Sequence, residues 1–178
     1  ERGQYHFAAA EVDLGSVISS VVEHLEGLSR SKSIQVRLTC CGRPIEDGRR
    51  FTVSGEDVLL YSMFSNLIIN ALQASPTGAA VTIDLAEEDA AAISIHNAGA
   101  VPMEIRERFF GKYVTAGKAM GTGLGAYSAL LMAKTLGGTI DMKTSEQEGT
   151  TLTVRLPRGT VGSSHQPSTT PRECARTF

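Results

Sequence analysis

The stretch Gly121-Thr122-Gly123-Leu124-Gly125 leads straight into a run with the pattern of a helix, residues 126–136. Glycines at alternate positions let a backbone turn tightly and bring its N–H groups close to an anion. A helix that starts there adds unpaired first-turn donors and the positive end of its dipole. The stretch is neither a Rossmann fingerprint nor a Walker loop, because the glycine spacing differs and no Lys-Ser or Lys-Thr follows. It indicates either a phosphate-binding loop or a glycine-rich turn before an amphipathic helix.

The composition is ordinary for one globular domain of 178 residues, of which 42% are hydrophobic and 20% charged. The formal net charge of -2 gives no electrostatic footprint for a nucleic-acid partner. No apolar run approaches the ~20 residues of a membrane span, so we expect no direct membrane contact from this segment. Cys40, Cys41 and Cys174 fit neither a disulfide framework nor a zinc site, which favours a cytoplasmic location. The chain opens on Glu1 rather than Met, as a fragment of a longer protein would.

Two long helices are predicted before the glycine stretch. In residues 14–30 apolar side chains recur every three or four positions, with Asp13 as the N-cap. Residues 56–74 form the second helix, whose inward face carries Leu60, Met63, Phe64, Leu67 and Ala71. A separate polar stripe on this helix consists of Ser62, Asn66, Asn70 and Gln73. Asparagine is a poor residue for a helix interior, so the stripe is either a solvated face or the polar wall of a site.

Alternating apolar and polar residues predict strands at residues 34–39, 80–85, 92–96, 139–144 and 150–156. The second and third form one hairpin, and the last two form another. Residues 50–53 are expected to pair with residues 34–39. The helix at residues 126–136 is expected to bury Leu130, Leu131 and Ala133. This order predicts an α+β fold: a two-layer α/β sandwich, with a mixed, mostly antiparallel sheet and helices packed on one face.

We expect three parts in the chain. Residues 1–13 form an extended lead-in, and residues 14–157 form the folded domain. Residues 158–178 are rich in Ser, Thr, Pro and Gly without periodicity, which indicates a disordered tail.

Four motifs, taken in order, resemble those of the ATP-binding catalytic domain of sensor histidine kinases, in the group shared with gyrase B, Hsp90 and MutL. Asn66-Leu67-Ile68-Ile69-Asn70-Ala71 looks like the N box of that family, and Asn97-Ala98-Gly99 like its first glycine box. Phe109-Phe110 resembles the phenylalanine box, and the stretch 121–125 the second glycine box. The resemblance covers residues 12–157. It implies the Bergerat ATP-binding fold, with a preceding dimerisation helix region leading in through residues 1–13.

The resemblance also implies roles for single residues. Asn70 would give its amide oxygen to Mg²⁺, a hard ion that prefers oxygen ligands. Asn66 stands where gyrase-like ATPases carry a glutamate that activates water; because an amide cannot take that proton, transfer to a protein is favoured over hydrolysis. Lys118, in the predicted lid 112–120, is either the cation for the γ-phosphate or an ordinary exposed lysine. Asn66 and Lys118 are thus the expected catalytic residues. The residues expected to contact ATP are Asn66, Asn70, Gln73, Asn97, Gly99, Val101, Tyr113, Lys118, Gly121, Thr122, Gly123, Leu124, Gly125 and Thr150.

The sequence departs from the family pattern at the base-reading motif. Asn97 stands in place of the usual aspartate, and the second glycine of Asp-x-Gly-x-Gly is missing. An amide oxygen can still accept from the adenine amino group. Loss of the charge-assisted bond would weaken the affinity about fivefold. In addition, Thr115 stands where many relatives have a phosphate-binding arginine.

The resulting expectation is a protein-histidine kinase domain with ATP and Mg²⁺ as cofactors and little turnover alone. Its partners would be a histidine-bearing dimerisation domain outside this chain and the receiver domain of a response regulator. None of the four histidines has the sequence context of a phosphoacceptor. The alternatives are a degenerate, non-catalytic nucleotide-sensing or partner-docking module of the same fold, and a serine kinase or ATPase of the superfamily.

Overall fold

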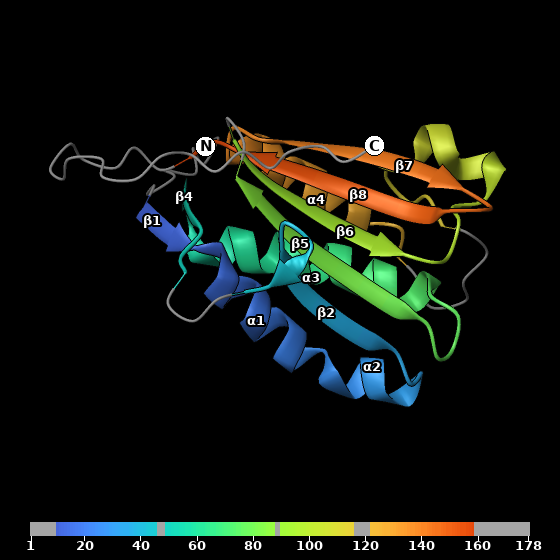
Figure 1. Ribbon diagram of the computed structural model, residues 1–178. Coiled ribbons are helices and arrows are strands. Elements are labelled where there is room, and N and C mark those ends of the chain that lie inside the picture. Colours follow the sequence, from blue (N-terminus) through green and yellow to red (C-terminus); the bar gives the residue numbers. More distant parts are fainter. Residues whose placement is uncertain (1–9, 46–48, 88–89, 116–121, 159–178) are drawn as a thin grey trace, which may run out of the picture.

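A six-stranded sheet, covered on one face by the helices, forms the centre of the molecule (Figure 1). The computed structural model describes residues 10–45, 49–87, 90–115 and 122–158, and the structural statements below concern these residues. In chain order the elements are β1 (Ala10–Asp13), α1 (Leu14–His24), α2 (Glu26–Ser31), β2 (Gln35–Cys40), β3 (Arg43–Pro44), β4 (Thr52–Gly55), α3 (Asp57–Ala74), β5 (Ala80–Glu87), β6 (Ala91–Asn97), the 3-10 helix η1 (Met103–Arg108), α4 (Gly125–Thr135), β7 (Thr139–Ser145) and β8 (Gly149–Leu156). The expected two-layer α+β sandwich is confirmed.

The large sheet is mixed and mostly antiparallel, with the strand order β3-β2-β5-β6-β8-β7. β2 pairs with β5 in parallel, whereas the other pairs in this sheet are antiparallel. Both expected hairpins are present, as β5–β6 and β7–β8. Neighbouring parallel strands need a long crossover connection, and α3 lies in the one between β2 and β5.

The expected pairing of residues 50–53 with residues 34–39 is wrong. β4 pairs with β1 in a separate two-stranded sheet, and β2 takes the short β3 as its antiparallel neighbour. The cause lies at the start of α1. There Asp13 Oδ1 accepts from Gly15 N, as expected of an N-cap, and also from Phe51 N. Leu14 N in turn donates to Phe51 O over 2.8 Å. An alternating pattern says which face of a strand is buried but not which partner it takes.

The single helix expected over residues 14–30 is divided at Leu25, which separates α1 from α2. Leu25 has φ −91° and ψ 6°, and its N–H still bonds back to Val21 O. Its side chain is buried, so the apolar side continues through the break. Gly27 follows in the next turn, where it lowers the helix propensity.

The inward face of α3 is the centre of the core, and its five expected residues are all at most 3% exposed. α4 differs from expectation, because Ala129 and Ala133 are buried while Leu131 is 45% exposed and Leu130 only partly buried. α4 packs against α3. The small side chains on the contact face allow the close approach of the two helices, which periodicity alone did not reveal.

The ends of the chain are described only in part. β1 lies within the expected lead-in, and its Val12 belongs to the core. Arg158 forms an isolated bridge with Val53, whereas residues 159–178 of the expected tail lie outside the described residues. Within the described ranges, no helix combines the length and the hydropathy that crossing a bilayer requires.

Candidate functional site

A cavity of about 580 Å³ lies between α3, the loop that follows β6, η1 and the start of α4. Of the residues expected to contact ATP, it brings together Asn66, Asn70, Gln73, Asn97, Val101, Thr122, Gly123, Leu124, Gly125 and Thr150. Gly99 and Tyr113 lie beside the cavity and are not among its lining residues. Lys118 and Gly121 lie outside the described residues, as does most of the predicted lid.

The polar stripe of α3 points two amides at the start of α4. A Cβ built on Gly125 would lie 3.5 Å from Asn66 Oδ1 and 3.8 Å from Asn70 Oδ1. Both side chains are half-buried, and neither forms a hydrogen bond within the described part of the chain. Ser62, the first residue of the stripe, does not line the cavity. The two asparagines therefore form a polar wall with free amide groups, which explains why a helix carries them a turn apart.

α4 begins in the cavity without a cap. Leu124 is its N-cap residue and makes no side-chain bond, and the first turn contains no acidic residue. The early N–H groups of a helix have no partners within the helix, and the helix dipole places positive charge at this end. With the free amides of α3 opposite, this end of the cavity suits an anion.

Gly123, within the glycine stretch, is in close backbone contact with Tyr113. Its φ is +66°, and a Cβ there would lie 2.5 Å from the carbonyl carbon of Tyr113. Tyr113 N donates to Gly123 O over 3.0 Å, and Lys112 Nζ lies 5.1 Å from the centre of the Tyr127 ring. The two sides of residues 116–121 are thus held together by backbone contact, which only glycine permits. The Tyr113 side chain itself is 73% exposed.

Asn97 closes the opposite end of the cavity and is only 4% exposed. Its Nδ2 donates to Gly99 O over 3.0 Å. A carbonyl oxygen only accepts, so the amide nitrogen must be the group that faces it. Asn97 Oδ1 then accepts nothing from the described residues, and it is not sealed off from solvent. The residue offers the cavity a hydrogen-bond acceptor, as the aspartate of the family pattern would.

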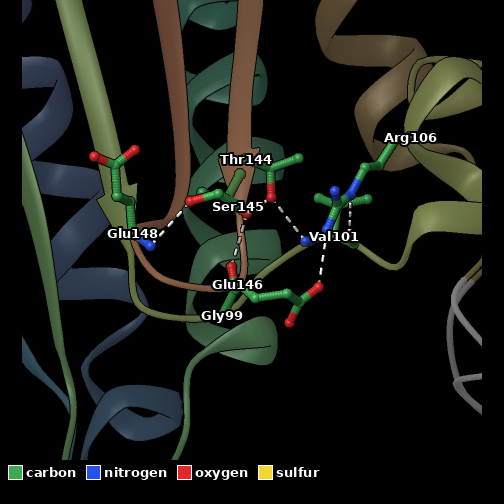
Figure 2. Close-up of polar contacts among 8 residues, drawn as sticks. Gly99, Val101, Arg106, Thr144, Ser145, Glu146 and Glu148 are labelled. Atoms are coloured by element: carbon green, nitrogen blue, oxygen red, sulfur yellow. Dashed lines mark hydrogen bonds and ion pairs between the residues drawn. The ribbon is translucent and has the colours of Figure 1, made fainter.

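Hydroxyl groups connect the loop after β6 to the β7–β8 hairpin (Figure 2). Thr150 Oγ1 donates to Gly99 O over 2.7 Å, and it lies 2.9 Å from Thr144 Oγ1. Because the Thr150 hydrogen points at Gly99, Thr144 must donate to Thr150. Thr144 Oγ1 in turn accepts from Val101 N over 2.9 Å. The Thr150 hydroxyl, on a residue expected to contact ATP, is therefore engaged mainly in holding this loop.

Glycine is required at Gly99 because the loop packs on the end of α3. A Cβ there would lie 2.2 Å from Ala74 O. Two positions on, where the family pattern has its second glycine, the Val101 side chain is buried and lines the cavity. Phe109 lines it as well, and its ring meets that of Phe110 edge to face at 5.0 Å. An apolar wall thus stands beside the Asn97 acceptor.

None of the described residues that line the cavity has an ionisable side chain. The polarity of the site comes from amides, hydroxyls and the α4 terminus. Within the described ranges, no three His, Cys, Asp or Glu side chains meet to hold a metal. Mg²⁺ does not need such a cage, because it commonly takes one or two protein ligands and completes its shell with phosphate oxygens and water. The free amide of Asn70 fits such a ligand.

Sequence reasoning missed Arg106, Thr144 and Glu146, which hold the loop after β6. Their contacts join residues far apart in the chain, and no local motif marks them. Periodicity also gave no sign of the apolar lining residues Ile105 and Leu152.

The family described as Histidine kinase-, DNA gyrase B-, and HSP90-like ATPase matches residues 55–160. This covers more than half of the chain, so the chain belongs to that family. Its motifs and fold are those of the ATP-binding catalytic domain of sensor histidine kinases, as the order of the four motifs predicted.

Two sensor proteins are similar over most of this chain. The sensor histidine kinase ZraS of Escherichia coli strain K12 is 29% identical over 154 residues, which are 85% of this chain and 32% of that protein. The sensor protein IrlS of Burkholderia pseudomallei strain K96243 is 27% identical over 164 residues, or 88% of this chain and 33% of that protein. The chain thus spans about a third of the length of each relative.

Solved structures share the fold. The mycobacterial sensor histidine kinase MprB superposes with a TM-score of 0.70 at 23% identity, covering 84% of this chain and 97% of that one. Full-length ShkA, solved in complex with AMPPNP, superposes with a TM-score of 0.70 at 19% identity, covering 85% of this chain and 31% of that one.

Proposed function

We propose that this chain binds Mg·ATP in the cavity and donates the γ-phosphate to a histidine on a separate dimerisation domain. The observation that carries the proposal is the convergence of three groups on one cavity, whose described lining residues carry no ionisable side chain. These groups are the free Asn97 acceptor, the free amides of α3 and the uncapped start of α4. Membership of an ATP-binding family supports it.

In this proposal the base lies at the Asn97 end. The adenine amino group donates to Asn97 Oδ1, and Val101 with its neighbours contacts the ring plane. Guanine carries an oxygen where adenine carries the amino group, so it would oppose one acceptor with another. The site should therefore prefer adenine nucleotides.

The phosphates lie at the start of α4. Its free N–H groups and the backbone of Gly123 and Gly125 receive their oxygens, and Gln73 lies on the α3 side. Asn70 is the proposed Mg²⁺ ligand, and the ion would supply charge neutralisation on the phosphate oxygens. Lys118 is the proposed cation for the γ-phosphate.

The proposed chemistry is transfer and not hydrolysis. Phosphoryl transfer needs positioning and electrostatic stabilisation more than covalent help from the protein. Asn66 occupies the cavity wall but cannot remove a proton from water, so it would orient groups without activating a hydroxide. The acceptor histidine then attacks the γ-phosphorus in line with the leaving oxygen.

The rest of the proposed system lies outside the described domain. Residues 14–157 are the proposed catalytic domain, reached through residues 1–13 from the dimerisation helix region. A response-regulator receiver domain would take the phosphoryl group from the histidine, and the setting would be the cytoplasm. The similarity to a sensor histidine kinase and to a sensor protein supports this assignment.

Calorimetric titration with Mg·ADP and Mg·GDP is the direct test. We expect micromolar binding of ADP, at least about tenfold weaker binding of GDP, and loss of affinity in Asn70→Ala. Ser62→Ala is the matched control, because it changes the same stripe of α3 outside the cavity. If neither nucleotide binds at millimolar concentration, the kinase function fails for this domain and the non-catalytic module replaces it.

Transfer is tested with a supplied histidine-bearing dimerisation domain and radiolabelled ATP. We expect a phosphorylated product that is labile to acid, since phosphohistidine is, while a phosphoserine product would survive acid. An acid-stable product would instead identify a serine kinase of the same superfamily.

A further inference from the structure

Arg106 bonds the loop that faces the cavity although its own side chain is not part of the cavity wall. It lies in η1, where its Nε donates to Val101 O over 2.7 Å. Its Nη2 pairs with Glu146 Oε1 over 2.9 Å in the β7–β8 turn. The Arg106 side chain is 24% exposed and that of Glu146 is 73% exposed. A planar guanidinium suits this double contact, because its donors point in fixed and separate directions.

Val101 is held by side chains on both sides. Its N–H donates to Thr144 Oγ1 over 2.9 Å, and its carbonyl accepts from Arg106. Figure 2 shows these contacts arriving from η1 and from the end of β7. The turn that carries Glu146 is itself closed by the bond from Glu148 N to Ser145 Oγ. Residues 98–102 are not part of a strand, so no ladder of backbone bonds fixes their position. The side-chain hydrogen bonds to Val101 fix it instead.

The acceptor of the site has no direct bond to Arg106, since the Asn97 amide is oriented by Gly99 O, which Thr150 also bonds. Asn97 is the last residue of β6 and lies opposite Thr150 in the β6–β8 ladder. The start of α4 belongs to another element and is held by Tyr113 at Gly123. Loss of Arg106 would therefore loosen the apolar wall at residues 100–102 and leave the acceptor and the anion end in place.

We propose that Arg106 is a positioning residue that holds this wall against the purine ring and so sets the base discrimination of the site. A ring held firmly must present its 6-substituent to Asn97 Oδ1. A purine ring that can shift in the cavity would move the guanine oxygen away from Asn97 Oδ1, which relieves the repulsion. The same shift would weaken the hydrogen bond from the adenine amino group. This inference rests on the proposed nucleotide binding and adds a residue that no motif marks.

The test compares Mg·ADP and Mg·GDP binding in the wild-type chain and in Arg106→Gln by calorimetry. We expect ADP to bind about fivefold more weakly, the equivalent of one typical hydrogen bond, while GDP binding changes little. The dissociation constant of Mg·GDP divided by that of Mg·ADP then falls by about the same factor. Arg155→Gln is the matched control, because Arg155 pairs with Asp141 on the same hairpin at 2.6 Å, away from the cavity. Its ratio should equal that of the wild type.

Two further variants separate positioning from general stability. Arg106→Lys keeps the charge toward Glu146 but lacks the forked donors, so its ratio should fall between those of the wild type and Arg106→Gln, and it decides the test if Arg106→Gln does not fold. Glu146→Gln keeps the Nε bond to Val101 and should keep most of the discrimination. A purely structural role would lower the Tm of the Arg106 variants without changing the ratio.

The outcomes of these measurements test the positioning role of Arg106 separately from the proposed nucleotide binding. A wild-type chain that prefers ADP, with Arg106 variants that prefer it equally, overturns the positioning role alone. A wild-type chain that binds neither nucleotide overturns the proposed function and this inference with it. A ratio that narrows in Arg155→Gln as much as in Arg106→Gln also overturns the positioning role, because it would make the effect general to the hairpin.

Discussion

At Asn97 the orientation of one amide determines which hydrogen-bonding atom of the side chain is left free. The amide nitrogen faces Gly99 O at 3.0 Å, and the same carbonyl receives the Thr150 hydroxyl. A carboxylate in this place would set a charged oxygen against a carbonyl oxygen. The asparagine therefore suits the hydrogen bonding of its own loop. We do not expect the aspartate of the family pattern to strengthen nucleotide binding here.

We therefore expect Asn97→Asp to bind Mg·ADP about five- to tenfold more weakly than the wild type, since a hydrogen bond is replaced by repulsion between two acceptors. Calorimetry measures the change, and Asn97→Ala sets the level at which both amide groups are gone. Tighter binding by Asn97→Asp would contradict the orientation of the loop.

Gly123 contributes to the candidate site through its backbone conformation. Its φ of +66° and its contact with Tyr113 exclude a side chain. We expect Gly123→Ala to lose at least about 1–2 kcal/mol of unfolding free energy, the cost of the left-handed conformation alone, and to bind nucleotide less tightly. Urea unfolding measures the stability. Gly27→Ala is the control, because a Cβ there meets nothing within 4 Å and alanine favours a helix. Equal stability of the two variants would count against the close packing at Gly123.

Among the elements, the C-terminal end of α3 is capped by a residue that lies well before it in the sequence. Lys32 Nζ donates to Leu72 O, Gln73 O and Ser75 O at 2.8, 3.0 and 2.5 Å. An ammonium at a helix C-terminus meets free carbonyls and the negative end of the dipole. Because Gln73 and Ala74 line the cavity, this cap also fixes one of its walls.

We expect Lys32→Met to lose about 1–3 kcal/mol of unfolding free energy, since it leaves helix-terminal carbonyls without their charged donor. Lys134→Met, in the exposed last turn of α4, should change the stability by less than about 0.5 kcal/mol. Chemical denaturation compares the two. A loss in Lys32→Met no larger than in Lys134→Met would show that water replaces the cap without cost.

The elements also mark how far sequence reasoning reaches. Both hairpins, the extent of α3 and the Asp13 cap were predictable, because each depends on local periodicity or one side chain. The partner of β4 and the buried face of α4 were not, since tertiary packing decides them. In the same way, the glycine stretch and the asparagine stripe pointed to the cavity, whereas Arg106 and Thr144 became visible only when distant segments were brought together.

For the whole molecule, we expect nucleotide affinity to be insensitive to alkaline pH, because the described residues that line the cavity are uncharged. No described lining residue titrates, and a terminal phosphate is already ionised above its second pKa of about 6. We expect the dissociation constant of Mg·ADP to change less than about threefold between pH 7 and pH 9. Calorimetry at three pH values in that range measures it. A steeper dependence would mean that an ionisable group outside the described residues contacts the ligand.

Binding should also stabilise the whole fold, because the cavity joins α3, the loop after β6 and α4. A ligand at 100 times its dissociation constant contributes about 2.7 kcal/mol, which raises the Tm of a domain of this size by about 5–10 °C. Scanning calorimetry with Mg·ADP measures the shift, and Asn70→Ala at the same ADP concentration should show a smaller one. Equal shifts in both proteins would remove Asn70 from the site.

The directional chain of hydrogen bonds from Val101 through Thr144 and Thr150 to Gly99 has a consequence for small-molecule design. Its last hydroxyl hydrogen is already engaged by Gly99 O, and one of the two amide hydrogens of Asn97 is bound to the same carbonyl. Thr150 therefore offers this end of the cavity a lone pair, and Asn97 offers its free Oδ1 beside the second amide hydrogen. We expect a fragment that projects an exocyclic amine to find acceptors here, whereas a ketone of the same shape would place its oxygen opposite Asn97 Oδ1.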